Sequence, residues 1–121
     1  MIMDHKLKLM VVDDSPLFRT WLIRSLSEDD RFQVVGYAVN ALDAQEKIPL
    51  LQPDMLTLDI EMPGMSGIDF LKQLLPVHPI PVILVSSLNL RVFDALEAGA
   101  VDFVRKPDEA NGLSKEIFLS M

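Results

Sequence analysis

Near its start the chain reads Lys8-Leu9-Met10-Val11-Val12-Asp13-Asp14-Ser15, an apolar run of strand length that ends in two adjacent carboxylates. Two later segments share this arrangement. The run Met55–Leu58 is followed by Asp59, and the run Val101–Arg105 is followed by Lys106. If the three strands are parallel, their carboxyl ends meet at one edge of a sheet. That edge would hold three carboxylates and one ammonium group, which suits a hard divalent cation beside a phosphoryl group.

The length and composition indicate a single acidic domain. The chain has 121 residues, of which 50% are hydrophobic, so it can bury a core of its own. A net charge of −7 without any basic run argues against direct nucleic-acid binding and against an anionic membrane surface. The absence of cysteine excludes disulfides and thiolate metal sites and is compatible with a reducing cytoplasm. No apolar run is long enough for membrane insertion, and the N-terminus lacks the features of a signal peptide, so we expect a cytoplasmic location.

Strand-like and helix-like segments alternate along the chain. Ser15 and Pro16 predict a helix start, Pro49 predicts a kink or an end in the last turn of the second helix, and Gly99 predicts the end of the fourth. The alternation predicts an α/β fold with a doubly wound parallel sheet. The expected strands are Leu7–Val12, Gln33–Ala38, Met55–Leu58, Val82–Val85 and Val101–Val104, and the expected helices are Pro16–Glu28, Ala41–Leu51, Gly67–Leu75, Leu90–Ala98 and a last one from about Leu113.

Each member of the acidic cluster also has a purely structural explanation. Either Asp13 or Asp14 could cap a helix, Asp59 could simply precede a connecting loop, and Lys106 could be a solvated surface residue. Taken together, these residues favour a functional site over separate structural roles. Otherwise several strand ends would carry groups suited to phosphoryl chemistry by accident. A carboxylate can attack phosphorus and form an acyl phosphate if its negative charge is neutralised. Asp59 is the best candidate nucleophile because it comes from the middle of the chain.

Three motifs resemble those of response-regulator receiver domains. They are Val-Val-Asp-Asp-Ser at 11–15, Leu-Asp-Ile-Glu-Met-Pro-Gly-Met-Ser-Gly at 58–67 and Phe-Val-Arg-Lys-Pro at 103–107. The resemblance covers nearly the whole chain, which we expect to be a single receiver domain over residues 1–121. It implies a flavodoxin-like, five-stranded sheet of order 2-1-3-4-5 with helices on both faces.

The resemblance also implies a role for each site residue. Asp59 would accept a phosphoryl group from the phosphohistidine of a histidine kinase, and Leu88 would shield that group from water. The Lys106–Pro107 bond is expected to be cis by the same resemblance. The remaining implied roles are Mg²⁺ binding by Asp13, Asp14, Asp59 and the Glu61 backbone carbonyl, phosphoryl contact by Lys106 and the Ser86 hydroxyl, and switching by Ser86 and Phe103.

A narrower resemblance is to the receivers of chemotaxis protein-glutamate methylesterases. It rests on the segments 57–63, 85–88 and 99–104. The chain has no Gly-x-Ser-x-Gly motif, and His5 and His78 are expected to be bystanders, so the esterase output domain is expected to be absent. Signalling to that domain, or to a partner protein, would use the face formed by helix 4, strand 5 and helix 5. Between Ser86 and Gly99 the chain is shorter than this subgroup leads us to expect.

Three other functions remain open at this point. The chain could be a stand-alone receiver that acts by binding a partner, or a receiver-like module that is never phosphorylated. It could also be a small aspartyl-phosphate phosphatase, a class that usually needs a second Asp two positions after the nucleophile. That position is Glu61 here, which disfavours the phosphatase.

Overall fold

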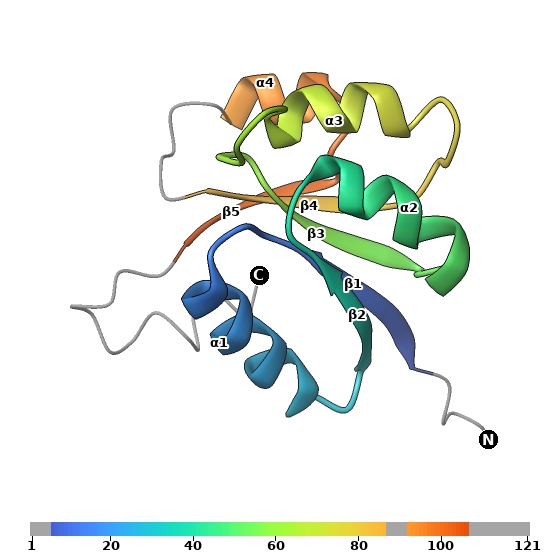
Figure 1. Cartoon of the computed structure of the whole chain (residues 1–121), viewed down its shortest axis with the longest axis vertical. Helices are drawn as coiled ribbons and strands as arrows, with labels where there is room; N and C mark the ends of the chain where they lie inside the picture. The colour runs from blue at the N-terminus through green and yellow to red at the C-terminus, as the bar shows by residue number, and fades with distance from the viewer. Residues whose placement is uncertain (1–5, 87–91, 107–121) are drawn as a thin grey trace.

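The computed structural model describes residues 6–86 and 92–106. Five parallel strands form one sheet in the order β2-β1-β3-β4-β5, which confirms the predicted topology (Figure 1). The strands are β1 (Leu7–Val12), β2 (Phe32–Ala38), β3 (Met55–Asp59), β4 (Val82–Ser86) and β5 (Asp102–Arg105).

The helices cover both faces of the sheet. Figure 1 shows α1 below the sheet, and α2, α3 and α4 above it. The expected helix at Leu90–Ala98 is described as α4 from Val92 onwards, and the expected last helix from Leu113 lies outside the described residues. The helices are α1 (Pro16–Ser27), α2 (Ala41–Leu51), α3 (Gly67–Leu74) and α4 (Val92–Glu97).

Alternate residues of β1 belong to two different cores. Leu9 and Val11 pack in the same buried cluster as Leu22 of α1. Met10 and Val12 pack in the other cluster, which includes Phe70 of α3. All four β1 residues are buried, because successive side chains of a strand point to opposite faces and both faces are covered here. This explains why the strand is apolar throughout from Leu9 to Val12.

Local signals define most of the helix ends. Ser15 caps α1, and its side chain accepts a hydrogen bond from the backbone N–H of Phe18 at 3.3 Å, as expected. Pro49 lies within α2 but does not end it, because the helix continues to Leu51. The helix ends at Gln52, which has a left-handed φ of 48° and donates its N–H to the Ile48 carbonyl.

Three strands end one residue later than predicted. β3 includes Asp59, β4 includes Ser86, and β5 begins and ends one residue later than expected. Pairing of Asp59 with Val85 and of Ser86 with Arg105 extends the sheet to these positions. Asp59 and Ser86 therefore belong to the sheet itself, where hydrogen bonds to neighbouring strands hold their backbones.

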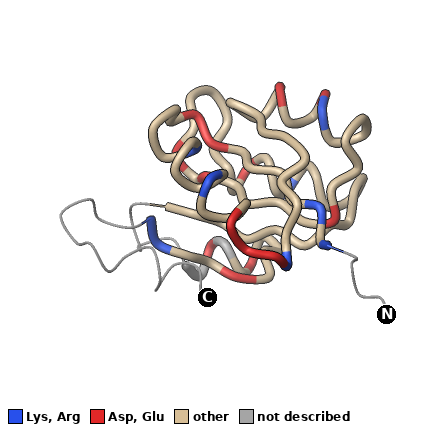
Figure 2. Tube along the Cα trace, turned by 90° about the horizontal axis from the view of Figure 1, so that it is seen from below, with Lys and Arg blue, Asp and Glu red and all other residues tan. Residues whose placement is uncertain are grey.

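No helix in the described part of the chain is long and apolar enough to cross a membrane. Within the same residues, Lys and Arg are scattered along the trace, as Figure 2 shows, in agreement with the lack of a basic run in the sequence.

Candidate functional site

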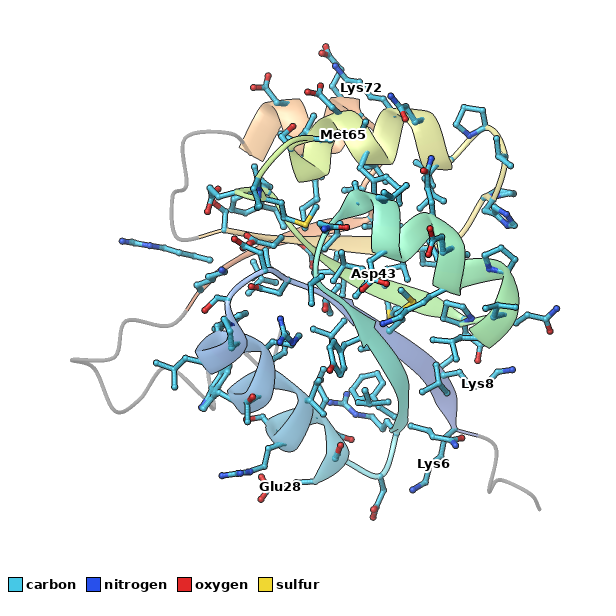
Figure 3. The ribbon with its side chains drawn as sticks, in the orientation of Figure 1. Lys6, Lys8, Glu28, Asp43, Met65 and Lys72 are labelled. Atoms are coloured by element: carbon cyan, nitrogen blue, oxygen red, sulfur yellow. The ribbon has the colours of Figure 1, made fainter. Side chains whose placement is uncertain are left out.

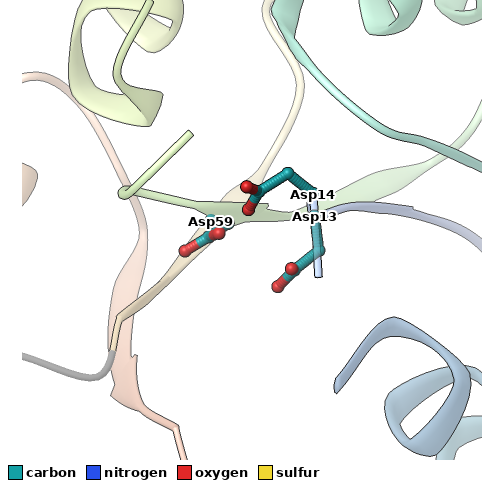
Figure 4. A group of neighbouring side chains, drawn as sticks. All are labelled: Asp13, Asp14 and Asp59. Carbon is teal, nitrogen blue, oxygen red and sulfur yellow. The ribbon is translucent and has the colours of Figure 1, made fainter. Parts of the chain in front are cut away.

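The register of the sheet brings the carboxylates at the ends of β1 and β3 together. Val12 pairs with Leu58, so the next residues, Asp13 and Asp59, lie beside each other. Asp14 joins them, and carboxylate oxygens of the three residues lie within 4.8 Å of one another (Figure 4). Asp13 and Asp59 are buried, whereas Asp14 is exposed. The cluster is therefore reachable from solvent at Asp14.

Asp59 is the most deeply enclosed carboxylate, with an exposed fraction of 1%. Its Oδ1 accepts a hydrogen bond from the Glu61 N–H at 3.2 Å and lies 3.5 Å from Lys106 Nζ. Its Oδ2 is buried and has no hydrogen-bond partner among residues 6–86 and 92–106. Burial, and after it the charge of Asp13, raise the pKa of Asp59 to about 8, although the nearby ammonium of Lys106 lowers this pKa. A buried carboxyl with an unsatisfied oxygen is costly to keep, which is typical of functional sites.

Asp13 is also buried, but both of its carboxylate oxygens have a partner. Its Oδ1 accepts a hydrogen bond from the Ser15 N–H at 2.8 Å, and its Oδ2 lies 3.3 Å from Lys106 Nζ. Burial raises the pKa of Asp13, while the Ser15 N–H and the Lys106 ammonium lower it. The Arg19 guanidinium donates a hydrogen bond to the Asp13 backbone carbonyl at 2.8 Å, which holds the start of the turn in place.

Lys106 joins the end of β5 to the cluster. Its backbone N–H donates to the Ser86 carbonyl at 2.7 Å, so the residue continues the sheet pairing beyond Arg105. The ammonium lies between Asp13 and Asp59 on one side, and 4.6 Å from the centre of the Phe18 ring on the other. The sequence predicted the carboxylate neighbours. The Phe18 ring was not predicted as a neighbour, because helical periodicity reveals burial but not which charge lies above a ring.

Ser86 lies at the end of β4 and is 1% exposed. Its hydroxyl donates a hydrogen bond to the side-chain carboxylate of Glu61. The sequence singled out only the backbone carbonyl of Glu61, so this side-chain contact was missed. The residue type two positions after Asp59 was visible, but its reach to a neighbouring strand depends on the register of β3 and β4.

Gly67 brings the start of α3 against the Asp59 backbone. A Cβ atom at this position would overlap the Asp59 carbonyl oxygen, so no larger residue fits without a shift of the backbone. The Gly67 N–H donates to the Ile60 carbonyl at 2.9 Å, which closes the loop between β3 and α3. The sequence identified Gly67 only as part of a motif and as a helix start.

Phe103 is half-buried and packs against the core on the α2 and α3 side of the sheet. It pairs with Leu84, two residues before Ser86 on β4. Its switching role stays a prediction. Leu88 and Pro107 lie outside the described residues, and so do the expected shielding by Leu88 and the expected cis bond before Pro107.

The donor set fits a hard divalent cation. Asp13, Asp14 and Asp59 offer carboxylate oxygens, which Mg²⁺ prefers, and the unsatisfied Oδ2 of Asp59 is a buried oxygen ready to take a ligand. Lys106 supplies a fixed positive charge at the opposite side of Asp59. The arrangement can therefore gather negative oxygens around a nucleophilic carboxylate.

Comparison with known proteins agrees with this architecture. Residues 9–118 match the family model of the response regulator receiver domain. The chain is 49% identical over 116 residues to protein-glutamate methylesterase/protein-glutamine glutaminase 2 of Syntrophomonas wolfei; the match covers 96% of this chain and 34% of that protein. The chain thus spans about a third of the length of this relative.

Solved structures show the same similarity. The response regulator domain of Thermotoga maritima CheB has a TM-score of 0.83 and 38% identity, over 93% of this chain and 87% of that one. A CheX-CheY-BeF₃-Mg²⁺ complex from Borrelia burgdorferi gives a TM-score of 0.77 and 29% identity, over 95% of this chain and 90% of that one. The fold, the acidic strand ends and these matches lead to one conclusion: the chain belongs to the response regulator receiver domain family.

Proposed function

We propose that this receiver domain is a phosphoacceptor, with Asp59 as the residue that receives the phosphoryl group. The observation that carries the proposal is the Oδ2 atom of Asp59, buried and without a hydrogen-bond partner among residues 6–86 and 92–106, beside two further carboxylates. The ammonium of Lys106 lies 3.5 Å from the other oxygen. A buried carboxyl with an unsatisfied oxygen destabilises the folded state, and such groups are found mainly at functional sites. A role as phosphoacceptor explains why it is present.

The donor is proposed to be a phosphohistidine on a histidine kinase. An oxygen of Asp59 attacks phosphorus, the P–N bond breaks, and its electron pair returns to the imidazole, which takes up a proton. The product is an acyl phosphate, which water later hydrolyses back to the carboxylate and inorganic phosphate. Lys106 is placed to pair with a phosphoryl oxygen as a compact positive charge.

Mg²⁺ is the proposed cofactor, held by Asp13, Asp14, Asp59 and the backbone carbonyl of Glu61. When bound, it supplies the positive charge that allows an anionic phosphoryl group to approach a cluster of carboxylates. A similar solved structure is described as a complex with BeF₃ and Mg²⁺, which supports the same chemistry at this site.

The signal is proposed to leave through Ser86 and Phe103. A phosphoryl group on Asp59 would draw the Ser86 hydroxyl toward itself and open space into which the Phe103 ring can turn. The face around α4 and β5 would change shape as a result, provided that it interacts differently with its target in the two states. Because the matched relative is a methylesterase of about three times this length, we infer that the target is an esterase domain of the same protein.

A phosphatase is the second candidate, and one contact argues against it. Its acid/base group would have to be Glu61, two positions after Asp59, but that carboxylate accepts the hydrogen bond of Ser86. In the proposed receiver role Glu61 contributes only its backbone carbonyl to the site, so no acid/base group is tied up by this contact.

The decisive experiment is phosphorylation by acetyl phosphate with Mg²⁺, followed by intact mass measurement and hydroxylamine treatment. The expected product is one hydroxylamine-sensitive phosphoryl group that is lost in Asp59→Asn. Asp30→Asn serves as the control, because Asp30 is an exposed carboxylate outside the cluster. Labelling that persists in Asp59→Asn, or no labelling of the natural chain, would overturn the proposal. Rapid turnover of a phosphate monoester would favour the phosphatase instead.

A further inference from the structure

Lys106 contacts an aromatic ring as well as two carboxylates. A lysine is a point charge on a flexible four-carbon stem, and its side chain loses much rotational freedom when it is fixed. Here Asp13 Oδ2 and Asp59 Oδ1 attract the ammonium from 3.3 and 3.5 Å. In the proposed function, however, Asp59 is the group that is phosphorylated, and Asp13 shares its charge with Mg²⁺. A partner that stays the same before and after phosphorylation would keep the ammonium at the site.

The Phe18 ring is such a partner. Lys106 Nζ lies 4.6 Å from the ring centre, within the range in which the negative face of an aromatic ring attracts a cation. The side chain of Lys106 is only 16% exposed, so water screens this attraction weakly. The ring has no titratable group and cannot be phosphorylated, so its attraction is constant throughout the cycle.

Phe18 is itself held firmly. Its backbone N–H is bound by the Ser15 cap at the start of α1. Its ring stacks on Trp21 with 5.5 Å between centroids and 30° between planes, and it packs against the core on the α1 side of the sheet. The surface beneath the ammonium is therefore fixed by the fold and does not depend on the flexible lysine.

We propose that Phe18 is a positioning residue for Lys106: its ring holds the ammonium beside Asp59 so that it can pair with the incoming phosphoryl group. This inference rests on the proposed function, since it assigns Phe18 a part in phosphorylation. It adds a member from α1 to a site otherwise built from strand ends.

The test replaces Phe18 with mono-, di- and trifluorophenylalanine, which weaken the negative face of the ring in steps and change its volume little. The rate of acetyl-phosphate labelling is expected to fall at each step, by roughly three- to thirty-fold over the series. Phe18→Leu should show the largest loss, and Phe18→Tyr, which keeps an aromatic face, should recover most of the rate. Thermal unfolding of each variant shows whether the fold is intact.

The matched control is the same fluorine series at Phe32. That ring belongs to the same core and also lies beneath a cation, with the Arg31 guanidinium carbon 5.1 Å from its centre. Phe32 pairs with Leu7 at the start of β1, whereas Asp13 follows the other end of that strand. Fluorination there should leave the labelling rate unchanged.

A second readout needs no phosphorylation. The Phe18 ring should shift the NMR signals of the Lys106 ε-methylene group upfield relative to Lys72, which points away from the sheet on α3 (Figure 3). The shift should vanish in Phe18→Leu. The loss of the shift together with the graded loss of rate supports the proposal.

Two results overturn it, and they are distinguishable. If the natural chain is labelled on Asp59 but the fluorine series at Phe18 has no effect on the rate, the positioning role is wrong and the proposed function stands. If the natural chain is never labelled, the proposed function fails and the role of Phe18 fails with it, whatever the NMR shift.

Discussion

The hydroxyl of Ser86 donates a hydrogen bond to the carboxylate of Glu61, across the ends of two neighbouring strands. A hydrogen bond to an ionised acceptor is stronger than one between neutral groups. In the proposed switch Ser86 must turn toward a phosphoryl group on Asp59, so this bond has to break first. The contact therefore opposes the activated state.

Replacing Glu61 with Gln should ease that transition. The amide is uncharged, so it holds Ser86 less strongly and repels an incoming phosphoryl group less. We expect Glu61→Gln to bind beryllofluoride in the presence of Mg²⁺ about three- to ten-fold more tightly than the natural chain, as the loss of roughly 1 kcal/mol from a competing bond would give. Titration followed by Trp21 fluorescence measures this. Glu46→Gln, an exposed change on α2, is the control, and equal or weaker binding by Glu61→Gln would contradict the competition.

The pKa of Asp59 makes stability depend on pH in the metal-free protein. In the native state the pKa is raised to about 8, mainly by burial, whereas the unfolded value is near 3.8. Between these values the native state holds a proton that the unfolded state has lost, so the free energy of unfolding must fall as the pH rises. The stabilisation that the native state gains by keeping this proton on Asp59 is fully present below about pH 4 and is lost as the pH rises through 8.

Asp59→Asn should remove this dependence. We expect the variant to be more stable than the natural chain by about 1–2 kcal/mol at pH 8, as is common when a strained functional group is neutralised. The difference should shrink toward pH 4. Urea unfolding with EDTA across this range measures it. A difference that stays constant with pH would show that Asp59 does not titrate as described.

Added Mg²⁺ should stabilise the folded chain through the acidic cluster. A ligand at one hundred times its dissociation constant adds about 2.7 kcal/mol if it binds only the native state. Asp14→Ala should abolish the gain, because it removes one of the three clustered carboxylates. Thermal unfolding with and without Mg²⁺ is the measurement, with Asp30→Asn as the control. An undiminished gain in Asp14→Ala would refute the proposed ligand set.

Gly67 and Gly64 allow steric overlap to be separated from backbone strain. Gly67→Ala should cost about 1–3 kcal/mol and should lower Asp59 labelling, because its Cβ would overlap the Asp59 carbonyl oxygen. Gly64 has a φ of 83°, but a Cβ there would meet nothing within 4 Å, so Gly64→Ala adds strain alone, about 1–2 kcal/mol. Urea unfolding and labelling of both variants test this. Equal labelling would show that the contact at Gly67 does not affect the site.

Local patterns in the sequence were enough for most of the fold. The alternation of strand-like and helix-like segments predicted the doubly wound sheet, and the structure places Leu9 and Met10 in the two different cores on its faces. Ser15 was recognised as a helix cap because its type and its place before Pro16 form a local signal. The resemblance to receivers supplied the strand order, which periodicity alone does not determine. The predicted bounds of the second helix, Ala41–Leu51, are confirmed, with Pro49 in its last turn.

By itself, the sequence of this protein determined which residues end the strands: two carboxylates after β1, one at the end of β3 and a lysine after β5. These are properties of neighbouring residues in the chain. Only the tertiary structure decided that Asp59 is buried beside Asp13, that Lys106 lies over the Phe18 ring, and that Glu61 holds Ser86. The reason is physical. Register, burial and side-chain direction depend on contacts between segments far apart in the sequence. A shift of one residue in strand pairing would turn Asp59 and Ser86 to the other face of the sheet.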